Sequence, residues 1–188
     1  MTTFIALLRG INVGSSNKKV PMAELRALMS GMGFGNVQTY IQSGNAVFTA
    51  DEVDAEAVRL RVEAAIAKQF GFAVNVMALS ATELADAIRS NPLASTADDP
   101  AKLHLGFMAS TPDLTTLEAL RTKPHGNDGW SVVNRVFYLH TPHGFGKSVL
   151  APFVERTLKA PMTFRNWRTM EMLKDMSTSE RHPGCDQL

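Results

Sequence analysis

The first half of the chain alternates apolar runs with turn-forming residues in an order that predicts three strands around a helix. Residues 3–8 form a short apolar run that predicts a buried strand, and Pro21 suits the first turn of a following helix. Residues 36–42 and 46–50 are rich in β-branched and aromatic side chains. They flank Ser43-Gly44-Asn45, and we therefore expect a hairpin there.

Residues 51–90 add a helix, a strand and a second helix. Asp51 or Asp54 can cap an amphipathic helix that Gly71 ends, and residues 73–79 predict a strand. Ser80-Ala81-Thr82-Glu83 is a capping box that opens the next helix. The resulting order, βαββαβ with one further helix, is the ferredoxin-like arrangement.

The second half repeats this order after a polar segment, residues 91–100, that carries a proline near each end. We expect strands over residues 102–108, 130–133, 136–140 and 162–164, and helices opened by Thr111-Pro112, Ser148 and Asn166.

An offset of 88 residues aligns the two halves without a gap over residues 73–88 and 161–176. Val76 and Phe164 match in character, as do Ile88 and Met176. We therefore predict an α+β protein of two tandem ferredoxin-like modules with antiparallel sheets, residues 1–92 and 100–177, and a polar tail, residues 178–188. An α/β fold with a parallel sheet is the alternative, and the two hairpins count against it.

Each predicted sheet has one face covered by its own helices and one face bare. Trp130, Val132, Phe137 and Leu139 cannot all be buried by one set of helices if they alternate across the sheet, and Ile5, Leu7, Val47 and Tyr40 raise the same problem. We expect the modules to pack together, or a partner chain to cover the exposed faces.

The composition is that of a globular protein, with 45% hydrophobic and 20% charged residues among 188. No apolar run reaches 18 residues, so we expect no membrane span, and the N-terminus has no signal-peptide layout. Cys185 is the single cysteine, which favours a cytoplasmic location. The net charge of +1 argues against a dedicated nucleic-acid binder, although both ends of the chain are basic.

The segment from Arg9 to Lys19 is the first candidate site. It contains two glycines and three basic residues just ahead of a helix N-terminus, a place that suits a phosphate or a carboxylate. In a βαββαβ module this loop emerges beside the hairpin. We therefore group Arg9, Asn12 and Lys18 with Ser43, Gly44 and Asn45 as ligand-binding candidates; an ordinary solvated loop is the alternative.

The second candidate cluster combines Lys147 and Ser148 with Arg165 and Asn166. Gly146-Lys147-Ser148 resembles part of a P-loop, but the first glycine of that motif would fall at Thr141. We expect instead that Lys147 and Ser148 bind an anion at a helix N-terminus. If the modules pack together, the two clusters would face one cleft.

No catalytic constellation is evident in the sequence. His140 and His143 lack a nearby cysteine or acidic ligand, so we expect no metal site. Cys185 lies in the tail, where it is no candidate nucleophile, and the acidic residues near Asp54 are explained by a helix cap. The sequence therefore predicts neither a reaction nor a cofactor. Phe137 and Tyr138 lie on one strand, but alternation leaves only one of them able to stack on a base.

Several motifs together resemble the bacterial domain-of-unknown-function family 1697. They are Leu7-Leu8-Arg9-Gly10-Ile11-Asn12-Val13-Gly14, Met22-Ala23-Glu24-Leu25-Arg26, Gly33-Phe34, Thr39-Tyr40-Ile41-Gln42-Ser43-Gly44-Asn45 and Arg165-Asn166-Trp167. The resemblance runs to about residue 176, and the chain departs from the family at Gly14-Ser15-Ser16, where the family has Gly-Gly or Gly-Lys. The family has no established activity, so the resemblance implies the fold and the candidate positions only.

These observations predict a cytoplasmic protein that binds a small anionic ligand, phosphate- or nucleotide-like, at a basic site lined by loops. An RNA or single-strand-binding module is the first alternative. A structural role in an oligomer, which Met-rich helices permit, is the second.

Overall fold

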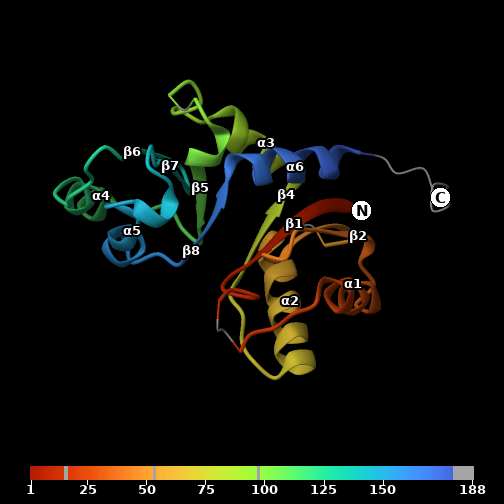
Figure 1. Cartoon of the computed structure of the whole chain (residues 1–188). Helices are drawn as coiled ribbons and strands as arrows, with labels where there is room; N and C mark the ends of the chain where they lie inside the picture. Colours follow the sequence, from red (N-terminus) through yellow and green to blue (C-terminus); the bar gives the residue numbers. More distant parts are fainter. Residues whose placement is uncertain (15–16, 53, 97, 180–188) are drawn as a thin grey trace.

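The computed structural model contains two four-stranded antiparallel sheets, each built by one half of the chain (Figure 1). The structure describes residues 1–14, 17–52, 54–96 and 98–179. Most of the predicted tail, with Cys185, therefore lies outside the described residues, as do Ser15 and Ser16. The first sheet has the strand order β2-β3-β1-β4 and the second β6-β7-β5-β8. The strands are β1 (Thr2–Leu8), β2 (Gly35–Tyr40), β3 (Asn45–Ala50), β4 (Val76–Ser80), β5 (Leu103–Met108), β6 (Gly129–Val133), β7 (Val136–His140) and β8 (Met162–Asn166).

The helices follow the predicted order with small shifts at their ends. They are α1 (Met22–Gly31), α2 (Ala55–Phe70), α3 (Ala81–Arg89), α4 (Leu114–Arg121), α5 (Ala151–Leu158) and α6 (Trp167–Thr178), with 3₁₀ turns η1 (Pro100–Lys102) and η2 (Phe145–Lys147). Asp54 caps α2, Ser80 and Glu83 form the predicted capping box, and Asn166 caps α6.

Two predicted helix starts in the second half are wrong. Asp113, and not Thr111-Pro112, caps α4 through the N–H of Thr116. The helix expected from Ser148 begins at Ala151, because η2 and a short turn come first.

The hairpin turns lie where predicted. Gly44 and Asn134 both have positive φ, at 79° and 53°, which tight turns between antiparallel strands require. At Gly44 an added Cβ would lie 2.7 Å from both Ile11 Cδ1 and Leu8 Cβ, so the position also lacks room for a side chain.

The two sheets share a hydrophobic core. Ile5, Leu7 and Val47 of the first sheet form one cluster with Leu105 and Tyr138 of the second, together with side chains of α3 and α6. In Figure 1, α6 and α3 run side by side across the first sheet, on the face opposite α1 and α2. The halves therefore pack together within one chain, which is the first of the two arrangements that we expected.

The expected conflict over the second sheet does not arise. Trp130, Val132, Phe137 and Leu139 all belong to one cluster with side chains of α4 and α5. Cross-strand partners share a face, and the register pairs Trp130 with Leu139 and Val132 with Phe137. Tyr138 lies in the shared core, with Val133 and Val136 of the same hairpin packed against it, and its hydroxyl donates to the Ala87 carbonyl at 2.8 Å.

Candidate functional site

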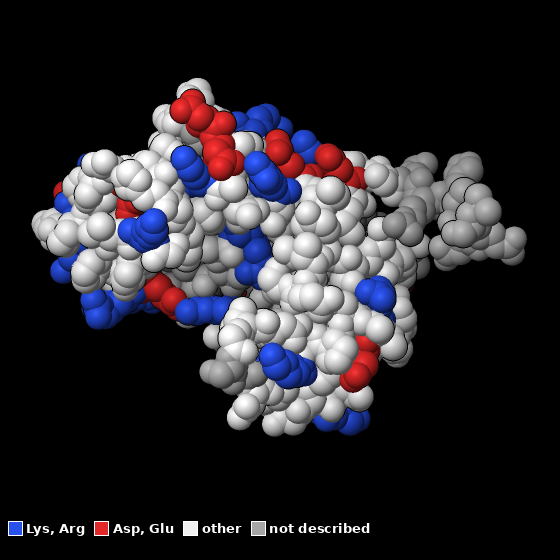
Figure 2. Space-filling model, in the orientation of Figure 1, with Lys and Arg blue, Asp and Glu red and all other residues white. Residues whose placement is uncertain are grey.

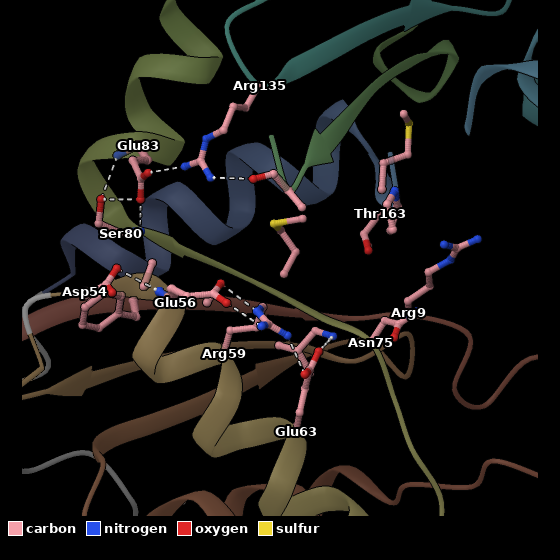
Figure 3. Close-up of a pocket in the computed structure, with 18 residues that line it drawn as sticks. Arg9, Asp54, Glu56, Arg59, Glu63, Asn75, Ser80, Glu83, Arg135 and Thr163 are labelled. Carbon is pink, nitrogen blue, oxygen red and sulfur yellow. Dashed lines mark hydrogen bonds and ion pairs between the residues drawn. The ribbon is translucent and has the colours of Figure 1, made fainter. Parts of the chain in front are cut away.

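A cleft of about 690 Å³ lies between the two halves of the molecule. Figure 2 shows the hollow, with basic and acidic side chains at its rim. Strand β4 forms its floor in Figure 3, and Met162 and Thr163 of β8 line it as well. Both β4 and β8 are edge strands of their sheets. The cleft is therefore bounded by one edge of each sheet.

Three arginines line this cleft, and each is paired with a carboxylate. Arg59 of α2 is held most firmly: its Nε and Nη2 donate to the two oxygens of Glu56 at 2.8 and 2.5 Å, and its Nη1 donates to Glu63 at 2.6 Å. These hydrogen bonds raise the pKa of Arg59 and lower the pKa of the Glu56 carboxyl. The other oxygen of Glu63 accepts from the main-chain N–H of Val76 at 2.9 Å. Arg59 thus stabilises the carboxylate that holds the start of β4.

Arg135 reaches the cleft from the turn between β6 and β7. Its Nη2 donates to Glu83 Oε1 at 2.8 Å, and both side chains are nearly half exposed, at 46% and 41%. The other oxygen of Glu83 accepts from the N–H of Ser80 in the capping box. One carboxylate therefore joins the start of α3 to the hairpin of the second half.

Arg9 lies at the end of β1 and makes the third pair. Its Nη1 and Nη2 donate to the two oxygens of Glu155, on α5, at 2.5 and 2.6 Å. Both side chains are 39% exposed. This planar, two-pronged pair is a second polar bridge between the halves.

Two of the predicted ligand residues, Arg165 and Asn45, contact each other. Arg165 Nε donates to the Oδ1 of Asn45 at 2.5 Å, and its Nη2 donates to the carbonyls of Leu8 and Ser43 at 2.7 and 3.0 Å. Asn45 is fully buried, and its Nδ2 donates to the Tyr40 carbonyl and the Ser43 hydroxyl. Burial lowers the pKa of Arg165 to about 10. The two predicted clusters therefore meet, as a joint between the halves.

The remaining candidates of the first cluster hold the loop after β1. Asn12 Nδ2 donates to the carbonyls of Val20 and Gln42, and its Oδ1 accepts from the Val20 N–H. Lys18 Nζ donates to the Ala73 carbonyl at 2.8 Å. The Gly44 carbonyl accepts from the N–H of Leu8. These hydrogen bonds tie the loop to main-chain groups of neighbouring segments.

The helix N-terminus expected to bind an anion at Lys147 and Ser148 already holds a carboxylate of the protein. Asp128 Oδ2 accepts from the Ser148 hydroxyl and from the N–H groups of Val149 and Leu150, at 2.8 to 3.1 Å. Neither Lys147 nor Ser148 is among the described residues that line the cleft. Of the residues in the two predicted clusters, Arg9 is the one that lines it. The expectation that both clusters face one cleft is therefore wrong.

The side chains that dominate the cleft were not predicted as site residues. Arg59 and Glu63 belong to an amphipathic helix, Glu83 has a local role in a cap, and Arg135 occupies a hairpin turn. Among the described residues no three or more His, Cys, Asp or Glu side chains are grouped so that they could hold a metal ion.

The comparisons with known proteins concern the family and the fold. A family model described as proteins of unknown function, DUF1697, matches residues 1–138. The chain belongs to this family. The resemblance seen in the sequence is thereby confirmed, and the DUF1697 match includes Arg9, Arg59, Glu83 and Arg135 but ends before Arg165.

The fold of this DUF1697 protein is similar to that of a conserved bacterial protein from Streptococcus pneumoniae. The similarity covers 94% of this chain and 99% of the other, with 27% identity and a TM-score of 0.72. No curated protein matches the chain. Within the described ranges, no helix is both long enough and apolar enough to cross a membrane.

Proposed function

We propose that the protein binds a small anionic ligand, phosphate- or nucleotide-like, in the cleft between its halves. The observation that carries the proposal is that Arg9 and Arg135 line one cleft and that each is held by a single, half-exposed carboxylate. The ligand takes the place of Glu155 on Arg9 and of Glu83 on Arg135. Guanidinium groups suit this task because their paired N–H donors match phosphate and carboxylate oxygens.

The exchange requires little free energy because exposed ion pairs contribute only about 0–1 kcal/mol to stability. Arg59 stays with Glu56 and Glu63, since two carboxylates hold it and its side chain is only 27% exposed. It therefore fixes one wall of the cleft. The lining carries three arginines against the four acids Asp54, Glu56, Glu63 and Glu83, so it has no excess positive charge. An anion therefore binds by replacing the carboxylate partner of an arginine.

This proposal moves the ligand away from most of the residues singled out in the sequence. Asn12, Lys18, Ser43, Gly44 and Asn45 are assigned to the loop and the hairpin. Lys147 lies in η2, Ser148 holds the turn before α5, Arg165 belongs to the joint, and Asn166 caps α6.

Binding is tested by thermal shift and calorimetry with inorganic pyrophosphate and with nucleoside diphosphates. We expect at least one probe to raise the melting temperature, and Arg135→Ala or Arg9→Ala to weaken its binding about 10- to 100-fold. Arg168→Ala is the matched control, because Arg168 pairs with Asp99 and does not line the cleft. The proposal is overturned if no probe binds, or if the two cleft variants bind as tightly as the control.

No specific observation favours nucleic-acid binding over this reading. Phe137 and Tyr138 are both fully buried, so neither presents a ring on which a base could stack. RNA binding and a role in an oligomer stay as predictions from the sequence.

We also propose that the halves are tandem ferredoxin-like modules that arose by duplication, with boundaries near residues 92 and 100. The support is the shared element order, the equivalent strand orders 2-3-1-4 and 6-7-5-8, and the offset of 88 residues in the sequence. A cytoplasmic location is proposed on the cysteine content alone.

A further inference from the structure

The floor of the cleft is the free edge of β4. Strand β4 pairs with β1 on one side, and no described strand pairs with its other side. Asn75, Val76, Met77, Ala78 and Ser80 all line the cleft. An edge of this kind presents main-chain N–H and C=O groups that can pair with another extended segment.

The register decides which groups face the cleft. The N–H of Arg9 donates to the carbonyl of Asn75. In an antiparallel strand the main-chain N–H and C=O groups of successive residues point alternately to one neighbouring strand and to the other. The main-chain N–H and C=O of Met77 therefore point toward β1, whereas those of Val76, Ala78 and Ser80 point away from β1, toward the cleft.

Two of the outward N–H groups are already occupied by side chains of the cleft. The N–H of Val76 donates to Glu63, and that of Ser80 donates to Glu83. The N–H and C=O of Ala78 and the C=O of Val76 have no partner among the described residues. Ala78 is only 7% exposed, and main-chain polar groups in such surroundings normally find a hydrogen-bond partner.

We propose that the cleft binds a short extended peptide that adds as a strand to the β4 edge at Ala78 and places a carboxylate on Arg9 or Arg135. The three unpaired main-chain groups fit a peptide segment of about three residues. Only every second residue of a strand directs its N–H and C=O toward a given neighbouring strand. The arginines near the two ends of β4 supply the charge complementarity, and the proposal rests on the proposed function only for their role. Glu63 and Glu83 occupy the flanking N–H groups and so limit pairing to the centre of the strand.

The probes are an array of N-acetylated pentapeptides with free C-terminal carboxylates, in which alternating Val and Thr residues carry one Glu at each position in turn. We expect some members to bind the full-length protein, and Ala78→Pro to weaken their binding at least tenfold. Proline removes the outward N–H and leaves the pairing with β1 intact, since Ala78 does not donate to β1. Ala78→Gly is the matched control, because it keeps both main-chain groups.

N-methylation of the peptides gives a test that does not depend on the folding of a variant. Methylating one amide at a time should abolish binding at alternate positions and leave the intervening positions unaffected. The proposal is overturned if no peptide binds, if methylation has no alternating effect, or if Ala78→Pro folds and binds like Ala78→Gly.

The two proposals fail separately. Pyrophosphate binding that depends on Arg135, without any peptide binding, overturns the peptide and leaves the anion site standing. Peptide binding that depends on Ala78 but is unchanged in Arg9→Ala and Arg135→Ala overturns the placement of the carboxylate. If pyrophosphate and nucleoside diphosphates also fail to bind, the anion site is overturned while the peptide site stands.

Discussion

Arg165 of β8 donates a hydrogen bond from its Nε to the Oδ1 of Asn45, the first residue of β3, although 120 positions separate them in the chain. The same guanidinium reaches the carbonyls at the end of β1 and in the hairpin turn. This partly buried side chain thus joins the second half of the molecule to the first.

We expect Arg165→Ala to lower the free energy of unfolding by about 3–5 kcal/mol. The change leaves Asn45 Oδ1 and two main-chain carbonyls without their donor, and unsatisfied buried polar groups are costly. Urea unfolding at neutral pH measures the loss. Arg165→Lys should recover only part of it, because an ammonium cannot reproduce the fork. Arg168→Ala, an exposed arginine on the next helix, is the control, and an equal loss there would contradict the assignment.

Gly44→Ala should destabilise the protein by about 2–4 kcal/mol. The residue has φ of 79°, and the new methyl group would meet Ile11 and Leu8 at 2.7 Å. Gly146→Ala is the matched control because its φ is unexceptional and an added Cβ finds open space. Thermal unfolding of the two variants side by side gives the comparison, and similar melting temperatures would show that the hairpin turn tolerates a side chain.

The stability of the protein should fall as the pH drops below about 6.5, in part because of His104. Burial lowers the pKa of His104, which packs against the ring of Phe145 with centroids 4.7 Å apart. The unfolded chain, with its ordinary pKa near 6.5, then takes up a proton that the folded protein resists, so acid favours unfolding. His104→Leu should flatten the dependence of the unfolding free energy between pH 7.5 and 5.5. His143→Leu, at an exposed histidine, is the matched control, and an equal flattening there would contradict the assignment to His104.

At the alkaline end, Tyr138 should have the corresponding effect. Burial raises its pKa to about 12, so the unfolded chain releases the phenolic proton first as the pH passes 10. The folded state then loses up to about 1.4 kcal/mol per pH unit. Tyr138→Phe should cost about 1 kcal/mol at neutral pH, where it removes the hydrogen bond to Ala87, and should show a shallower loss between pH 10 and 11.5. Parallel slopes for the two proteins would contradict the assignment.

The sequence was sufficient for features that depend on neighbouring residues. The caps at Asp54, Ser80 and Asn166 and the turn at Asn134 follow from side chains a few positions apart, and they lie where predicted. The α+β class and the two antiparallel sheets are also confirmed.

The cleft depends on contacts between distant segments and could not be predicted in the same way. Arg135 and Glu83 are 52 positions apart, and Arg9 and Glu155 are 146 apart. The carboxylate that Ser148 binds could not be predicted for the same reason, because it belongs to Asp128, 20 positions earlier in the chain. Nothing in the local pattern of these residues indicates which distant partner each will meet.

The position of α6 has a consequence for how the protein is made. This last described helix contacts β1 and β3 of the first sheet and belongs to the core cluster that buries Ile5 and Leu7. A ribosome adds the 88 residues from 91 to 178 in about 4–18 s, since synthesis runs at about 5–20 residues per second. During that interval the first sheet is complete in sequence, and of the two helices on this face only α3 has been made. The nascent chain therefore exposes part of the apolar face around Ile5 and Leu7 until α6 has been made.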